Sequence, residues 1–507
     1  MVARIATVAF QGIDVLPIST EVHIANGLPA FTIVGLPDKA VGESRERVRA
    51  ALGSIGLALP AKRITVNLAP ADVIKEGSHF DLPIAVGLLC AMGIFSNDSF
   101  EKLWVMGELG LDGRIAPVAG VLPAAVAATA GNAGFVCPAV QGPEAAWSGN
   151  KDIIAPVSLS ELVLCFKEGK TLPQPVPGQI QATSNVFDMK EIKGQENAKR
   201  ATEIAAAGGH NLLVIGPPGS GKSMLAQRLP GLLPALTTKE ILEISMIHSV
   251  AGLLRDGNLI TQRPFRAPHH SASMPALIGG GQKARPGEIS LAHNGVLFLD
   301  ELPEFSRVAL DSLRQPLETG EVSVARVSMH VTYPARFQLI AAMNPCRCGY
   351  LGVAGQECSR APKCGEDYQS RISGPLFDRM DLHVEVPAVA PWDLAKAREG
   401  ESSAVIAERV AEALNRQKRR YERIAAESEV TKNAQASGSL LEQTALLSDQ
   451  ASDLLVKAAE KMRLSARGYH RVIRVARTIA DLAGQNEILP VHIAEALSYR
   501  RISHIKE

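Results

Sequence analysis

The most informative stretch of the sequence is an apolar run that leads into a glycine-rich loop. Residues 216–223 read G-P-P-G-S-G-K-S and satisfy the pattern G-x-x-x-x-G-K-[S/T] at each fixed position. Glycines have no Cβ, so successive backbone N–H groups can turn toward phosphate oxygens, and the following helix presents its positive end to the same anion. The predicted phosphate-binding residues are Gly216, Pro217, Pro218, Gly219, Ser220, Gly221, Lys222 and Ser223.

Two side chains of this loop could act directly on a nucleotide. We expect Lys222 to reach the β and γ phosphates and Ser223 to hold Mg²⁺ through its hydroxyl. A glycine-rich turn without a ligand is the alternative. Because strand, loop and helix signals coincide here, the pattern favours a site for ATP and Mg²⁺.

Polar side chains end two later apolar runs. Asp300 and Glu301 follow residues 295–299, a run typical of a buried parallel strand whose carboxyl end faces a ligand. Asp300 would position Mg²⁺, and Glu301 would polarise the water that attacks the γ-phosphate. Asn344 follows a third run, where its amide could contact that water or the γ-phosphate; capping of the loop is the alternative.

Two arginines further along could complete such a site. Arg379 lies between two aspartates, and in a ring ATPase an arginine here would project into the neighbouring subunit's site. The alternative is an ion pair within the chain, with Asp378 or Asp381. Arg467 and Arg471 share one face of a predicted helix. Such a row is usually solvated, but we expect Arg467, rather than Arg471, to fold back onto the nucleotide.

Four of the seven cysteines crowd into one region and could bind a metal. Four thiolates are sufficient for a tetrahedral, structural Zn²⁺, because four protein ligands leave no open position for water. The spacings are looser than in common zinc motifs, so four reduced thiols are an equal alternative. We expect the adjacent His269 and His270 to be packed or hydrogen-bonded and not to bind a metal. The candidate zinc ligands are Cys346, Cys348, Cys358 and Cys364.

The elements that position these residues predict an α/β chain of several domains. The 507 residues are sufficient for two to four domains. We expect a mixed α/β domain over residues 1–168, a proline-rich linker over 169–187, a nucleotide-binding αβα core over 188–390 and a helical domain over 391–507. The net charge of +1 means that any polyanion must be bound by a local arrangement. With no apolar run of membrane-spanning length and no cleavable leader, the sequence predicts a cytoplasmic protein without a membrane partner.

The first domain resembles the proteolytic domain of Lon-type proteases in residues 75–85 and 107–120. A Lon-type site needs a serine nucleophile and a lysine base, because the hydroxyl must lose its proton to an amine. The aligned serine position falls on His79, with Ser78 adjacent, and residues 118–126 contain no lysine. We therefore expect a non-catalytic relative, with an active peptidase as the lesser alternative.

Four further segments carry a resemblance that extends over the whole chain. They are F-R-A-P-H-H-S-A-S at 265–273, the stretch 286–301, N-P-C-R-C-G at 344–349 and S-A-R-G-Y-H-R at 465–471. They resemble the ComM/YifB family of magnesium-chelatase-like AAA+ ATPases. The resemblance implies a Lon-like (ribosomal S5 domain 2-like) first domain, an AAA+ P-loop core, a helical lid and a hexameric ring. It also implies that Gln195 borders the adenine pocket; an ordinary helix start is the alternative.

For this family the resemblance further implies a helicase that drives branch migration of DNA in recombination during natural transformation. Residues 318–334 read as two short strands with Arg326 near the turn, similar to the channel hairpin of MCM helicases. Arg326, together with Lys283 and Arg285 on a glycine-rich loop, could follow the phosphates of single-stranded or branched DNA. A structural hairpin with a solvated arginine is the alternative. Two other functions stay open: a chelatase-type ATPase that remodels a protein partner, and an ATP-dependent protease.

Overall fold

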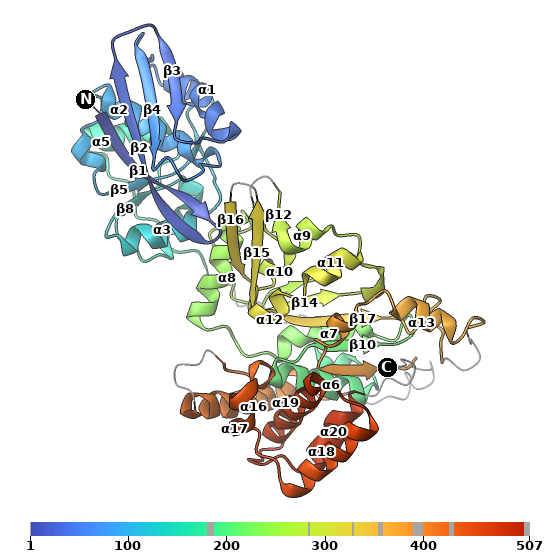
Figure 1. Ribbon diagram of the computed structural model, residues 1–507. Coiled ribbons are helices and arrows are strands. Elements are labelled where there is room, and N and C mark those ends of the chain that lie inside the picture. Colours follow the sequence, from blue (N-terminus) through green and yellow to red (C-terminus); the bar gives the residue numbers. More distant parts are fainter. Residues whose placement is uncertain are drawn as a thin grey trace.

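The computed structural model describes residues 2–179, 187–281, 284–326, 329–352, 358–388, 399–424 and 430–500. Figure 1 shows three parts that follow one another in space as in sequence: an N-terminal α/β part in blue, a central α/β part in green and yellow, and a C-terminal helical part in orange and red. Among the described residues, no helix has both the length and the apolar character that a membrane crossing requires.

The N-terminal part is built on a mixed seven-stranded sheet in the order β3-β4-β2-β1-β5-β8-β9. β4 buries every second residue, which is the alternation expected for a strand with one face on the core. The long antiparallel ladder of β1 and β2 turns at Gln11–Asp14. The strand bounds are β1 (Val2–Gln11), β2 (Asp14–Ala25), β3 (Ala30–Val34), β4 (Arg63–Ala69), β5 (Leu103–Val105), β8 (Gly134–Val136) and β9 (Ile153–Ile154).

Helices cover this sheet. In α2, residues 81–90 are all buried. In α1, the Asp38 side chain accepts a hydrogen bond from the N–H of Val41 and so caps the helix. The bounds are α1 (Lys39–Ser54), α2 (Asp81–Ala91), α3 (Val121–Ala130), α4 (Gly142–Ala146) and α5 (Leu159–Glu168).

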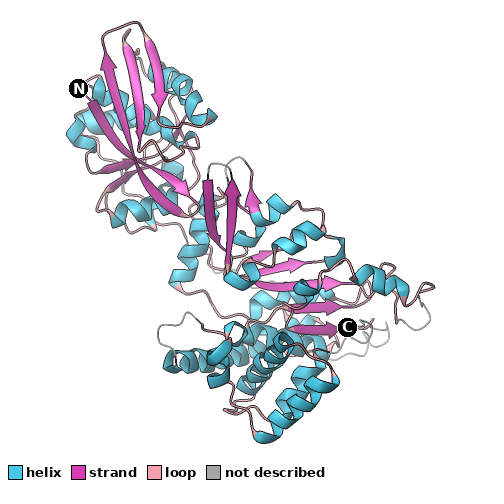
Figure 2. Cartoon of the chain, viewed as in Figure 1, coloured by secondary structure: helices cyan, strands magenta, loops and turns pink. Residues whose placement is uncertain are grey.

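The central part contains a five-stranded sheet in the order β11-β14-β17-β10-β18, in which every pair is parallel (Figure 2). Its inner strands are completely buried, as expected for a parallel sheet covered on both faces. This arrangement is that of an AAA core. The strand bounds are β10 (Leu212–Ile215), β11 (Phe265–Arg266), β14 (Val296–Leu299), β17 (Gln338–Met343) and β18 (Leu382–Glu385).

The two faces of this sheet belong to different apolar cores. On β10, Leu212 and Val214 pack into a core shared with the C-terminal helices, whereas Leu213 and Ile215 face the opposite core. That opposite core includes the hairpin of β15 (Glu321–Arg326) and β16 (Met329–Pro334). In the described central part, the helices of eight or more residues are α6 (Glu196–Gly208) and α8 (Thr238–Val250).

The C-terminal part is helical, as predicted. The amphipathic α16 buries a stripe at intervals of three and four residues, which is the spacing of one helical face. The stripe faces α6 and α19, so the core and the C-terminal helices share a continuous apolar interior. The bounds are α16 (Ser403–Ile424), α17 (Gly438–Thr444), α18 (Asp449–Lys461), α19 (Ala466–Leu482) and α20 (Pro490–Ser498).

Candidate nucleotide site

The glycine-rich loop joins β10 to α7 (Lys222–Arg228) and has the backbone that its sequence requires. Gly219 and Gly221 adopt φ of +74° and +91°, which side chains rarely tolerate. A Cβ on Gly216 would lie 2.2 Å from the carbonyl oxygen of Val386, so no larger residue fits there. The loop therefore closes tightly against the end of β18 and opens toward α7.

Lys222 lies at the centre of the loop and is only 8% exposed. Its Nζ donates to the carbonyls of Gly216 and Pro217, each at 2.8 Å, and to Oδ1 of Asn344 at 3.2 Å. Burial lowers the pKa of Lys222, against the opposing negative charges of Asp300 and Glu301. The ammonium group is thus already directed into the loop, where phosphate oxygens could replace the carbonyls.

Ser223 at the start of α7 is in contact with Asp300 at the end of β14. Ser223 Oγ donates to Asp300 Oδ2 at 2.7 Å, and Asp300 follows β14 directly. A hydroxyl and a carboxylate in contact form the oxygen donor set that Mg²⁺ prefers. The residues present therefore fit the expected metal.

Glu301 has an unusual backbone and an unexpected partner. Its φ of +51° is in the left-handed region, and its N–H donates to Asp300 Oδ1 at 2.9 Å. Its Oε2 lies 3.0 Å from Nδ1 of His270. The sequence predicted hydrogen bonding for His270 but not this carboxylate partner. The order of the strands supplies the reason, because β11, which precedes His270, is the neighbour of β14 in the sheet.

Arg379 forms an ion pair within the chain, with a partner that the sequence did not suggest. Its guanidinium donates to Glu318 and, at 2.7 Å, to the carbonyl of Pro375, and its side chain is 11% exposed. The two neighbouring aspartates, which were the partners under the alternative of an ion pair within the chain, lie 3.7 Å (Asp378) and 3.5 Å (Asp381) from Arg471 instead. In this arrangement Arg379 points back into its own chain.

The arginine row on α19 is not a uniformly solvated stripe. Arg471 is buried with 6% exposure, whereas Arg467 is exposed near the start of the helix.

Gln195 caps α6 with a left-handed backbone, and its Nε2 donates to the carbonyl of Pro387 at 2.7 Å. Pro387 follows β18, so Gln195 lies beside the chain segment that leaves the sheet.

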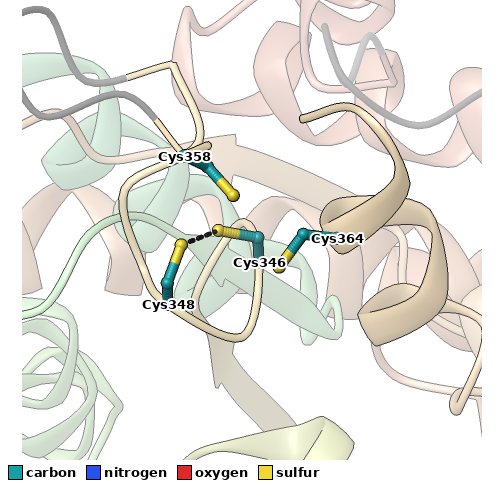
Figure 3. A group of neighbouring side chains, drawn as sticks. All are labelled: Cys346, Cys348, Cys358 and Cys364. Carbon is teal, nitrogen blue, oxygen red and sulfur yellow. Dashed lines mark hydrogen bonds between the residues drawn. The ribbon is translucent and has the colours of Figure 1, made fainter. Parts of the chain in front are cut away.

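The four cysteines of the candidate zinc site come together in one cluster (Figure 3). Their sulfur atoms all lie within 4.8 Å of one another, and the Sγ atoms of Cys346 and Cys348 are 3.1 Å apart. Zn–S bonds of about 2.3 Å in a tetrahedron place sulfurs roughly 3.8 Å apart. The cluster therefore fits a structural Zn²⁺ held by Cys346, Cys348, Cys358 and Cys364.

Two of the three DNA-contact candidates, Arg326 and Arg285, lie on or beside the hairpin. Arg326 ends β15 and pairs with Met329 of β16, which confirms two strands with Arg326 next to the turn. Arg285 is exposed at the start of β13 (Arg285–Pro286). The side chain of Arg326 and the whole of Lys283 lie outside the described residues.

The Lon-like segment does not assemble a serine–lysine pair. Ser78 Oγ donates to the carboxylate of Glu108, and His79 Nε2 lies 2.9 Å from the carbonyl of Val8. The buried Lys75 instead donates from Nζ to the carbonyl of Pro70. A serine that donates to a carboxylate and a lysine directed to a different carbonyl do not form the base–nucleophile contact of a peptidase.

The sequence matches three family descriptions in chain order. Residues 20–141 match "Subunit ChlI of Mg-chelatase", residues 188–394 match "Magnesium chelatase, subunit ChlI", and residues 400–500 match "Magnesium chelatase, subunit ChlI C-terminal". Each match falls within one of the three parts of the structure. The first extends over most of the N-terminal sheet, the second over the nucleotide-binding loop and the parallel strands, and the third over the C-terminal helices.

Two relatives align over nearly their full length. The competence protein ComM of Haemophilus influenzae is 44% identical over 498 residues, which cover 97% of this chain and 96% of ComM. YifB of Salmonella typhimurium is 43% identical over 505 residues, 99% of this chain and 98% of YifB. The magnesium-chelatase 38 kDa subunit of Rhodobacter capsulatus is 30% identical over 180 residues, 32% of this chain and 51% of that subunit.

Proposed function

The chain belongs to the magnesium chelatase ChlI family, with ComM and YifB as relatives, and we propose that this AAA ATPase is a ring-forming motor that moves along DNA. We propose the three domains and the linker at the boundaries expected from the sequence, with a Lon-like first domain. Branch migration in recombination during natural transformation is the activity we infer for the motor. The 44% identity to a competence protein over nearly the whole chain supports this choice.

The proposed chemistry is hydrolysis of ATP at the ends of the parallel strands. Lys222 would exchange its loop carbonyls for β and γ phosphate oxygens, and Ser223 and Asp300 would hold Mg²⁺, which neutralises phosphate charge. Glu301 would release His270 and orient the attacking water, while Asn344 holds Lys222 at the γ-phosphate.

Residues from a second subunit would complete this site. We propose that Arg379 leaves Glu318 and stabilises charge on the neighbouring subunit's γ-phosphate in a hexameric ring. We also propose that Arg467, which is exposed at the start of α19, turns toward the nucleotide from the lid, and that Gln195 borders the adenine. A nucleotide-dependent increase in mass in solution is the expected sign of ring assembly.

The observation that carries the DNA function is the hairpin of β15 and β16 with Arg326 beside its turn. An arginine on a moving hairpin can follow phosphates without reading bases, since its charge alone supplies the attraction. Lys283 and Arg285 would add two charges on a second loop. The overall net charge of +1 makes such a local arrangement necessary.

The test is the ATPase rate with and without forked DNA. Wild type should be stimulated, and Arg326→Ala should lose most of the stimulation but keep the rate without DNA. Arg45→Ala, which removes an exposed arginine from α1 of the N-terminal part, is the matched control and should behave as wild type. Removal of one phosphate contact should reduce the salt slope of DNA binding by about one. Intact stimulation in Arg326→Ala would exclude the hairpin assignment.

A chelatase-type ATPase that remodels a protein partner is the second candidate. It is favoured by the similarity to the magnesium-chelatase 38 kDa subunit, which is 30% identical over 180 residues. ATP turnover that no DNA structure changes would support this candidate against the DNA motor. The contact of Ser78 with Glu108 argues against protease activity. ATP-dependent degradation of casein would be the evidence for a protease.

We also propose that the four-cysteine cluster binds one structural Zn²⁺. Its sulfur spacing supports this, and the metal would hold together a loop that begins directly after Asn344. Elemental analysis of purified protein should give one zinc per chain. Cys348→Ser and Cys364→Ser should lose the zinc, whereas Cys165→Ser, outside the cluster, should retain it. Wild-type protein without zinc would leave four reduced thiols as the correct description.

A further inference from the structure

The turn between β1 and β2 reaches out of the N-terminal part and touches the hairpin of the central part. Gln11 Nε2 donates to the carbonyl of His330 on β16 at 2.9 Å. Gly12 has φ of +73°, and a Cβ there would lie 2.7 Å from the carbonyl oxygen of Thr332. The backbones of the turn and of β16 therefore approach as closely as a glycine allows.

The hairpin needs support from outside itself. β15 and β16 form a two-stranded sheet, and an isolated hairpin of this kind is marginally stable in water. Val324 and Val331 of the hairpin are buried in the apolar core of the central part, and Ile13 of the turn packs against the same core. The turn thus supplies an apolar contact as well as a hydrogen bond at the hairpin.

A second group of hydrogen bonds connects the N-terminal part to α8 and its following loop; α8 lies beside α3 in Figure 1. Ser249 Oγ donates to the buried carboxylate of Glu144 at 2.6 Å, and Gly120 N–H donates to the carbonyl of Ser249 at 3.0 Å. Trp147 Nε1 donates to the carbonyl of Gly257 at 2.8 Å. These bonds join the N-terminal part, which carries the turn, to the central part through residues outside the hairpin.

Beside the turn there is open space. A cavity of about 340 Å³ separates the N-terminal part from the strands of the hairpin. The turn contacts the hairpin beside this cavity, through Gln11 and Gly12. The residues that line the cavity from the two sides include Phe10, Ser78, Glu108, Arg285, Val331 and Tyr333.

We propose that residues 11–13 are a positioning surface for the hairpin, and that the N-terminal domain is the support against which the hairpin moves. The role of this surface in DNA unwinding rests on the proposed function, whereas the positioning of the hairpin does not depend on DNA. It gives the Lon-like domain a mechanical role in place of peptidase chemistry.

The positioning is tested by hydrogen exchange of the free protein. In the double variant Gln11→Ala/Ile13→Ala, backbone amides of β15 and β16 should exchange at least tenfold faster, while those of α19 should be unchanged. Leu28→Ala is the matched control, because Leu28 lies in the turn at the other end of β2 and is 88% exposed. Unchanged exchange of the hairpin in the double variant would overturn the proposal.

The consequence is tested by ATPase and strand-displacement assays on forked DNA. In the double variant, ATPase activity without DNA should stay within twofold of wild type, and base pairs opened per ATP should fall at least fivefold. Wild-type unwinding with a loosened hairpin would show that the support is not needed for movement and would overturn the mechanical role. If wild type itself ignores DNA, the proposed function fails, while the exchange result still decides the positioning.

Discussion

Arg379 offers the sharpest test of the motor, because the structure gives it a partner in its own chain. The guanidinium is 11% exposed and donates to Glu318, whose side chain is 58% exposed. A pair with one solvated partner is worth about 1 kcal/mol, or roughly fivefold in an equilibrium. An arginine that stabilises a transferring phosphoryl group from a neighbouring subunit is worth about 10³- to 10⁵-fold in kcat, or roughly 4–7 kcal/mol.

This difference in magnitude separates the two roles. If Arg379 acts on the neighbouring subunit, Arg379→Ala should lower kcat by about 10³-fold, whereas Glu318→Gln should change kcat by less than about fivefold. Both variants should lower the free energy of unfolding by about 1 kcal/mol, measured in urea. If Arg379 only holds Glu318, the two variants should lose similar activity and similar stability.

Mixed assemblies provide the decisive control. A site on an Arg379→Ala subunit keeps its own Glu301 and can receive Arg379 from a Glu301→Gln neighbour. Mixing the two inactive variants should therefore restore part of the ATPase activity. Absence of restored activity from assemblies shown to contain both subunits would refute a role across the interface.

The remaining predictions concern the nucleotide site and the core. Lys222→Ala should abolish the ATP-dependent increase in Tm, which for wild type at 100 times Kd corresponds to about 2.7 kcal/mol; Glu301→Gln should keep the increase and trap ATP in a filter-binding assay. His270→Ala removes the 3.0 Å contact with Glu301 between two partly exposed side chains, worth about 0.5 kcal/mol, and should raise DNA-free ATPase activity about twofold; a tenfold fall would instead assign His270 to the chemistry. Burial and the nearby Arg500 charge lower the pKa of His383 to about 3. Between about pH 6.5 and pH 3, His383 is therefore protonated in the unfolded chain and neutral in the native chain. Stability should fall as pH drops through this range, and His383→Gln should flatten that part of a Tm–pH profile.

Local sequence patterns were sufficient for the elements that carry the site. The glycine-rich loop, the apolar strand before Asp300 and the strand before Asn344 each lie within a few consecutive residues, and their form follows from backbone sterics and burial. The five-stranded parallel sheet and the C-terminal helices confirm the predicted α/β core and helical end. The roles of the individual site residues stay predictions, since they depend on bound nucleotide and on a second subunit.

Contacts between distant segments could not be obtained in this way. Gln11 and His330 are 319 positions apart, and Arg379 and Glu318 are 61 apart. Nothing in the periodicity of either segment specifies the other, because pairing is decided by the order of strands and by domain docking. The alternative of an ion pair within the chain therefore named the adjacent Asp378 and Asp381, whereas the partner in the structure is Glu318.

The cysteine cluster shows the opposite case, in which an irregular spacing still yields a compact arrangement. The four sulfurs of Cys346, Cys348, Cys358 and Cys364 lie within 4.8 Å of one another, although the intervals between them differ from those of common zinc motifs. Spacing rules describe simple turns, whereas here the fourth thiol comes from a helix, α13 (Lys363–Gln369).

The strand order explains why these features lie together. The strands β11, β14, β17 and β10 lie next to one another in the sheet. The residues that follow their carboxyl ends are in contact: His270 with Glu301, Asp300 with Ser223, and Asn344 with Lys222. Asn344 is also two residues from Cys346, and a Cβ on Gly349 would lie 2.6 Å from Pro218 of the phosphate loop. The cysteine loop therefore packs on the nucleotide loop and continues the strand that carries Asn344. A metal that fixes this loop would act on nucleotide binding through position alone, because none of its ligands needs to touch the phosphates.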